Sequence, residues 1–326
     1  MTWLVWRQHR VQFYLGAALL AAFAVLIVIT GVQVANQYHA AQVACAAGQG
    51  CRQGGGLFLG SHAVGFLVIS TLGAPVLVGL FLGAPLVAAE VEAGTIQFAW
   101  MQSVTRSRWL AVKIGWMLLA AAIWGGVISA LVTWWSGPNN AEQLNAFNPG
   151  RFDLTGLVPV AYSLFAMALG IAVGALVRRV LPAIAITLAG FIAVRAVVTL
   201  WLRPHYMSAV TVFYKVTSGF TPPGSFWSIA SGLLGPNGQA IGQNTNGNVF
   251  YGIPVNYLPA SCAAPSRGAV TVPPSCAQAL THFRGFLTYQ PGNRYWAFQG
   301  IETAIFVALA AALIAVTAVV LLRRDA

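Results

Sequence analysis

The sequence predicts an all-α polytopic membrane protein with six transmembrane helices. The hydrophobic fraction is 58%, and only 7% of the residues are charged, whereas about 25% are charged in soluble domains. The mean hydropathy is +0.74. Apolar runs of the length needed to cross a hydrocarbon core roughly 30 Å thick recur along the chain. An N-terminal interfacial helix and a loop-rich extracellular lobe between the last two helices complete the predicted architecture.

The predicted spans divide the chain into four parts. Residues 1–12 mix tryptophans and aliphatic residues with bases, which favours an amphipathic helix in the membrane interface; the alternative is a plain positively charged flank. Residues 13–202 hold the first five spans, residues 203–296 an outer lobe, and residues 297–326 the sixth span and a short tail. The spans are Phe13–Val34, Val64–Val87, Leu110–Trp134, Leu154–Val177, Val180–Trp201 and Ala297–Leu322.

The distribution of Lys and Arg predicts the orientation of the chain. Basic residues precede the first span, separate the second from the third and the fourth from the fifth, and follow the sixth. With six spans these four places lie on one side, which the positive-inside rule assigns to the cytoplasm. We therefore expect a multi-pass plasma-membrane protein with both termini cytoplasmic. The net charge of +11 then reflects topology and attraction to anionic lipid rather than nucleic-acid binding.

All four cysteines fall on the side predicted to be outside. Cys45 and Cys51 lie in the first outer loop, and Cys262 and Cys276 lie in the long one. An even number on the oxidising side predicts two local disulfides, Cys45–Cys51 and Cys262–Cys276. The alternative is unpaired thiols in flexible loops. Since no His or carboxylate stands at ligand spacing beside them, no metal site is predicted.

The segment from Arg203 to Trp296 has two parts. Its first part, from Met207 to Phe220, mixes apolar residues with Thr, Ser and Tyr, and we expect short re-entrant or surface helices there. Its later part is rich in Gly, Asn, Pro and Ser, which predicts a small loop-rich lobe. No nucleophile–base pair and no paired carboxylates occur in this segment, so we assign no catalytic residue.

The connector between the second and third spans, residues 88–109, holds two of the chain's six acids together with two arginines. Two acids directly follow the second span, a Gly-Thr pair then redirects the chain, and bases lead into the third span. We expect a short charged helix along the cytoplasmic face, with its charges available to a soluble partner. The residues that define this predicted coupling segment are Glu90, Glu92, Gly94, Thr95, Arg106, Arg108 and Lys113.

This E-x-E-x-G-T connector, followed by Ser107-Arg108 and a lysine, resembles the permeases of ABC-2 type exporters, as does the six-span architecture. The Trp-Arg-Gln-His-Arg stretch near the start is similar to an actinobacterial branch of that family. Many members have a proline before the Ser-Arg pair, whereas Val104-Thr105-Arg106 stands here. The resemblance implies that Glu90 to Arg108 acts as the coupling helix, which fits a groove on a nucleotide-binding subunit.

The resemblance also implies partners. The sequence contains no G-x-x-x-x-G-K-[S/T] phosphate loop, so we expect no cofactor on this chain, with ATP and Mg bound by a separate ABC ATPase subunit. Six spans are few for a complete exporter, which implies a second permease copy, either identical or a paralogue. The apolar spans suit an amphipathic or lipophilic substrate such as a drug, peptide or lipid. The alternative function is a non-transporting membrane anchor or sensor that recruits a cytoplasmic partner.

A membrane-embedded enzyme or a secondary transporter is disfavoured. Those classes usually carry several acids or histidines near the middle of the membrane. This chain offers Arg195 in the fifth span and Glu302 in the sixth, both near the outer end. Because an unpaired charge there costs at least about 2.5 kcal/mol, we predict an Arg195–Glu302 ion pair. It is either a structural lock between the last two helices or a substrate contact.

Small residues recur at four-residue spacing in two spans. The second span contains Gly79 and Gly83, and the fourth contains Gly170 and Gly174. This spacing permits close approach between helices. It indicates either a dimer face or packing within one chain.

Overall fold

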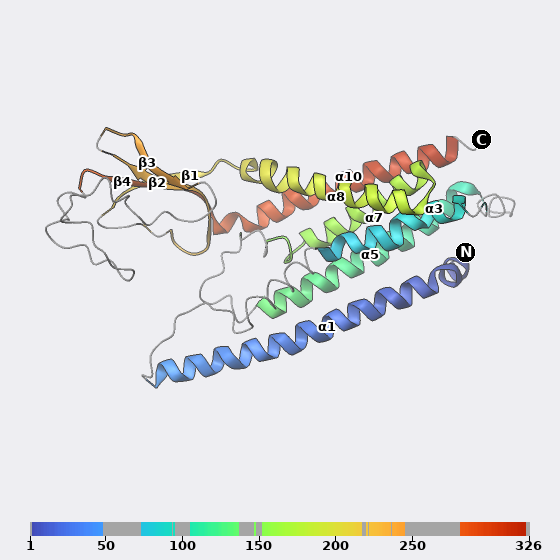
Figure 1. The fold of residues 1–326 in the computed structure, drawn as a ribbon, viewed down its shortest axis with the longest axis horizontal. Coiled ribbons are helices and arrows are strands. Elements are labelled where there is room, and N and C mark those ends of the chain that lie inside the picture. Colours follow the sequence, from blue (N-terminus) through green and yellow to red (C-terminus); the bar gives the residue numbers. More distant parts are fainter. Residues whose placement is uncertain are drawn as a thin grey trace. The chain divides into compact units, whose positions relative to one another are not determined.

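A computed structural model describes residues 2–47, 73–92, 94, 105–136, 147, 152–216, 220, 222–235, 237–244 and 281–323. In these residues six helices are long and apolar enough to cross a membrane, which confirms the predicted polytopic helical fold. The chain divides into two compact units (Figure 1). The first holds the membrane helices, and the second is formed by Asn145–Asn148 and Leu200–Trp296.

The long helices of the chain follow the apolar runs of the sequence. They are α1 (Thr2–Ala46), η1 (Gly79–Gly83), α3 (Ala84–Glu92), α5 (Arg106–Ser136), α7 (Val158–Val177), α8 (Val180–Val197) with η3 (Val198–Leu202), and α10 (Tyr295–Arg323). Helix α1 is continuous from Thr2, so the segment predicted as an interfacial helix runs into the first span without a helix break. Segment η1 is a π-helical turn inside the second span, between helical residues 73–78 and α3.

Four glycines allow the second span to cross α7 at close range. A Cβ atom added to Gly174 would lie 2.5 Å from the carbonyl oxygen of Ala84, and one at Gly83 would lie 2.8 Å from that of Met167. Gly79 and Gly170 are crowded by the same crossing. Of the two alternatives for this glycine pattern, the structure shows packing within one chain. Figure 1 shows α3 and α7 side by side at this crossing.

An apolar cluster fills the space between α3, α5, α7 and α10. Its buried members include Leu86, Met117, Met167, Ile171 and Leu321. Helix α1 lies along α5, where the hydroxyl of Thr30 accepts a hydrogen bond from the indole of Trp135 at 3.2 Å. Burial of the cluster fixes which faces of α3 and α5 meet, and this places the charged residues at the end of α3.

The second unit contains a four-stranded antiparallel sheet in the order β1-β4-β2-β3. The strands are β1 (Val210–Lys215), β2 (Phe226–Leu234), β3 (Ala240–Asn244) and β4 (Arg284–Pro291). Short re-entrant or surface helices were expected between Met207 and Phe220. This prediction is wrong for Val210–Lys215, which form strand β1. Its β-branched and aromatic residues alternate in burial with period two, which suits a strand.

An aromatic residue from a distant part of the sequence completes this unit. Phe147, which precedes α7, is only 2% exposed. Its ring stacks on Trp227 of β2 with centroids 6.1 Å apart and meets Tyr295 edge-on. Of the predicted disulfide cysteines, Cys51, Cys262 and Cys276 lie outside the described residues, and only the backbone of Cys45 is described.

Candidate coupling site

The two acids of the connector belong to the end of a membrane helix. The second span was expected to end at Val87, but α3 continues to Glu92, so both glutamates lie in its last turn. Two residues along a helix correspond to a rotation of about 200°. Glu90 and Glu92 therefore leave α3 on different sides and reach different neighbours.

Glu90 pairs with a lysine inside the bundle. The Lys113 Nζ atom of α5 lies 2.6 Å from Glu90 Oε1 and donates a hydrogen bond to the Leu86 carbonyl at 3.1 Å. The Lys113 side chain is only 1% exposed. Leu86 and Glu90 stand one helical turn apart, so a single ammonium holds two groups on the same face of α3. Because a buried ammonium requires such partners, this contact fixes α3 against α5.

Glu92 reaches the beginning of another helix. Its Oε2 atom accepts a hydrogen bond from the backbone N–H of Val180 at 3.1 Å. Val180 is the first residue of α8, and the preceding Arg179 provides no side-chain cap. The carboxylate therefore caps α8 from a different helix, where it also meets the positive end of the helix dipole. We call Glu90, Glu92, Lys113 and the Val180 amide the α3 clamp.

The α3 clamp includes the turn between α7 and α8. Only Arg178 and Arg179 separate these helices, so α7 and α8 form a tight helical hairpin. Arg178 adopts φ 60°, a left-handed conformation, and its N–H donates to the Gly174 carbonyl at 3.0 Å. Such a short turn leaves little freedom between the two helices, so a force on Val180 acts on the whole hairpin.

The other residues of the predicted coupling segment are partly described. Gly94 has φ +67° and its N–H donates to the Val91 carbonyl, which ends α3 as a left-handed glycine commonly does. Arg106 begins α5, although its side chain, like Thr95, lies outside what the structure describes. Arg108 is exposed. The expectation that the charges face a soluble partner thus fits Arg108, but it is wrong for Lys113, which is buried inside the chain.

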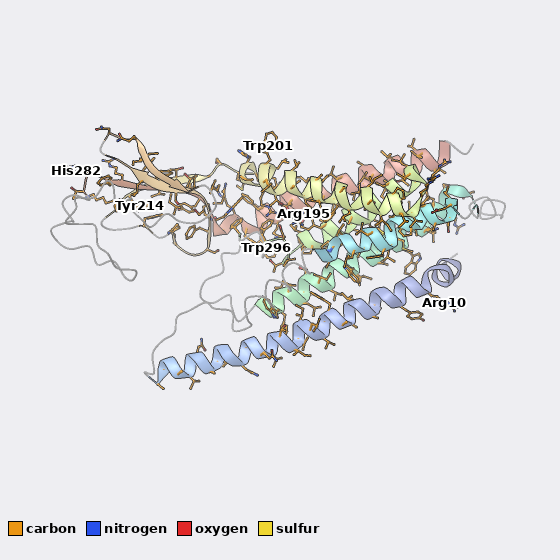
Figure 2. The ribbon with its side chains drawn as sticks, in the orientation of Figure 1. Arg10, Arg195, Trp201, Tyr214, His282 and Trp296 are labelled. Atoms are coloured by element: carbon orange, nitrogen blue, oxygen red, sulfur yellow. The ribbon has the colours of Figure 1, made fainter. Side chains whose placement is uncertain are left out.

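A second polar cluster surrounds Arg195 on α8. Arg195 is labelled in Figure 2. Its guanidinium lies 2.6 Å from Asp153 and 3.8 Å above the centre of the Tyr162 ring. The Tyr162 hydroxyl lies 3.3 Å from Asp153 and makes a short hydrogen bond with Glu302. Three of these side chains, those of Tyr162, Glu302 and Asp153, are at most 4% exposed. We call these four residues the Arg195 cluster.

The predicted ion pair of Arg195 with Glu302 requires correction. The structure brings both residues into one cluster, but the carboxylate that pairs with Arg195 is that of Asp153. Asp153 directly precedes the predicted fourth span, Leu154–Val177, and the predicted ion pair did not include it. In the structure it is buried beside α7. The small number of acids, six in the whole chain, was the signal that could have included it.

Sequence reasoning also missed Gln299, which lies on α10 one turn before Glu302. Its Oε1 atom accepts hydrogen bonds from the N–H groups of Leu157 and Val158, both at 3.1 Å, and its Nε2 donates to the Phe152 carbonyl at 3.0 Å. Gln299 therefore caps the beginning of α7 from α10. Within the described residues, no group of three or more His, Cys, Asp or Glu gathers that could hold a metal ion.

A comparison with known protein families identifies the family of this chain. Residues 17–203, more than half of the chain, match the family described as ABC-2 membrane transporter related. The chain belongs to this family. No curated protein and no solved structure matches it. The matched range contains the complete α3 clamp, and in ABC-2 transporters the permease is typically a non-catalytic membrane subunit that works with an ATPase.

Proposed function

We propose that this ABC-2 protein is the permease subunit of an ATP-driven exporter. A separate nucleotide-binding subunit binds ATP and Mg and hydrolyses the nucleotide, and two permease copies, identical or paralogous, form the pathway. The chain lies in the plasma membrane with both termini in the cytoplasm. Its substrate is amphipathic or lipophilic, because the spans are lined mainly by apolar side chains.

The observation that carries this proposal is the attachment of α3 to its neighbours. The segment that follows α3, residues 93–105, is proposed to dock on the ATPase. Just before it, Glu90 and Glu92 tie α3 to α5 and to α8. Movement of the docked segment therefore acts on three membrane helices at once. A connector that only linked two spans would not need these acids, since the positive-inside rule depends on bases.

The charge exposed beside this segment suits docking. Arg108 lies in the first turn of α5 with its side chain exposed, next to the exposed Ser107. A guanidinium in this position can pair with a carboxylate of the ATPase in bidentate geometry. The contribution of Glu90 and Lys113 is internal, because these two residues are engaged with each other.

The experiment is a mild-detergent pull-down of the tagged protein from its native host, with the eluate assayed for ATP hydrolysis. The test variant is Arg108→Glu, and the matched control is Arg10→Glu, which reverses an exposed arginine on α1. We expect an ATPase to co-purify with the wild type and with the control. The co-purified ATPase activity should fall at least about tenfold with Arg108→Glu. One lost charge-assisted contact of about 1.5–3 kcal/mol accounts for such a change.

The alternative function is a non-transporting anchor or sensor. If a folded wild-type permease brought down no ATPase, the exporter proposal would fail and the anchor would be favoured. Co-purification of an ATPase whose hydrolysis moves none of the membrane helices would also favour the anchor. A movement of α3 on nucleotide binding supports the exporter.

A further inference from the structure

We propose that Glu90 and Glu92 are positioning residues that pass the movement of the ATPase-docking segment to α5 and α8, and are not contacts for the ATPase. This inference rests on the proposed exporter function and deepens it. The sequence pattern alone assigned both acids to docking. The geometry directs both of them into the chain's own helices.

The two attachments differ in their surroundings. The Glu90–Lys113 pair lies beside the apolar cluster of α3 and α5, and the lysine is almost fully buried. Separating a buried pair leaves an uncompensated charge, so this contact persists throughout a transport cycle. Glu92 is exposed, and its one hydrogen bond within the described residues is with the backbone N–H of Val180. Water can replace that bond at low cost, so the contact with α8 is the weaker of the two and the one that a single substitution can open.

This difference assigns a role to each acid. Glu90 makes α5 follow α3, whereas Glu92 makes the α7–α8 hairpin follow α3 only while the cap is intact. The hairpin turn is too short to absorb a displacement within itself. The start of α8 therefore moves with α3 when the cap is closed and separately from it when the cap is open. Loss of an N-cap acceptor lowers the equilibrium ratio of the capped to the uncapped state by a factor of about 2 to 30.

Three variants separate positioning from docking. Glu92→Ala removes the acceptor, whereas Glu92→Gln retains an amide oxygen that can accept the same hydrogen bond without its charge. Val180→Pro removes the N–H donor and leaves Glu92 unchanged. A proline is tolerated as the first residue of a helix, and Arg179 already has the extended conformation that precedes proline, with φ −134° and ψ 133°.

The measurement is the distance between spin labels at Ala89 on α3 and Leu181 on α8. Both positions are exposed. Labels are introduced through unnatural amino acids, which leaves the native cysteines intact. The permease–ATPase complex in lipid nanodiscs is compared without nucleotide and with vanadate-trapped ATP. ATPase stoichiometry is measured in the same samples.

We expect one narrow distance distribution in both states for the wild type and for Glu92→Gln. Glu92→Ala and Val180→Pro should both broaden or shift the distribution with trapped nucleotide, with the ATPase bound at the wild-type ratio. Loss of the ATPase from Glu92→Gln, with full retention in Val180→Pro, would instead make the Glu92 charge a docking contact and overturn the inference. An unchanged distribution in Val180→Pro would also overturn it.

Failure of the proposed function has a different signature. It appears in the unlabelled wild type as the absence of any co-purified ATPase, and it removes the basis of both proposals. A wild-type complex with bound ATPase but independent movement of α3 and α8 overturns only the positioning role. If Glu92→Ala does not fold, Val180→Pro alone decides, because it changes the same hydrogen bond from the other side.

Discussion

The α3 clamp and the Arg195 cluster solve the same problem in different ways. Both hold charged side chains in a bundle of apolar helices. From Val180 to Arg195, α8 rises by about 22 Å, so the two lie at well-separated levels of the same helix. The α3 clamp consists of two separate contacts, one buried ion pair and one exposed helix cap. The Arg195 cluster joins two acids, one arginine and a tyrosine into a single network.

The difference indicates how each region responds to force. Each contact of the α3 clamp involves a separate pair of groups, so one can open while the other stays closed. In the Arg195 cluster every member touches at least one other, and the members come from α7, its preceding turn, α8 and α10. Loss of one side chain there changes the surroundings of all the others. The clamp is therefore suited to movement, and the cluster to holding three helices together.

The largest expected effect is at Lys113. Lys113→Met leaves the Glu90 carboxylate without its ammonium in a mostly buried site, which should lower the free energy of unfolding by about 3–5 kcal/mol. The double variant Lys113→Met/Glu90→Leu replaces the pair by apolar side chains and should recover most of the loss. Thermal unfolding in detergent measures both. If Lys113→Met alone were as stable as the wild type, the Glu90–Lys113 pair would not be a fixed part of the clamp.

A slightly smaller effect is expected at Arg195, whose side chain is 15% exposed. Arg195→Leu should destabilise the protein by about 3 kcal/mol, because Asp153 loses its cation. Arg195→Lys should recover only part of this, since an ammonium lacks the planar group that lies over the Tyr162 ring. Asp153→Asn should cost more than Glu302→Gln in the same unfolding assay. The reverse order would restore Glu302 as the main partner of Arg195.

The crossing of α3 and α7 links the two regions and should show an intermediate effect. Gly174→Ala places a methyl group against the Ala84 carbonyl, and overpacking of this kind costs about 1–3 kcal/mol. Gly126→Ala on α5 is the matched control, because no atom lies within 4 Å of the added Cβ. The control should be neutral or slightly stabilising, as alanine favours helices. Equal effects of the two variants on unfolding temperature would contradict the close crossing.

The smallest expected effect is at Glu92. Removal of an exposed helix cap by Glu92→Ala should lower the free energy of unfolding by about 1 kcal/mol, and Glu92→Gln by a few tenths. The same assay that detects the loss at Lys113 resolves this contrast. If Glu92→Ala were as destabilising as Lys113→Met, the clamp would behave as one cooperative network like the Arg195 cluster.

Local patterns of the sequence were enough to predict the membrane helices and some of their ends. Hydropathy and run length depend only on neighbouring residues, and they placed six spans that the structure confirms. The two-residue connection at Arg178 and Arg179 was predictable for the same reason, as was the change of direction at Gly94, although α3 continues past the expected end of the second span at Val87. The sheet was missed because the pattern of β1 is short and its partner β4 lies far along the chain, where Val210 faces Tyr289.

The amino-acid sequence by itself determined that this chain is a polytopic membrane protein with its few acids placed beside or within the spans. Only the tertiary structure decided which group each acid meets. Glu92 caps a helix 88 residues away, and Arg195 pairs with Asp153 rather than Glu302. Such choices depend on which helix faces pack together. Packing is set by close contacts such as the Gly83 and Gly174 crossing, which no local pattern resolves.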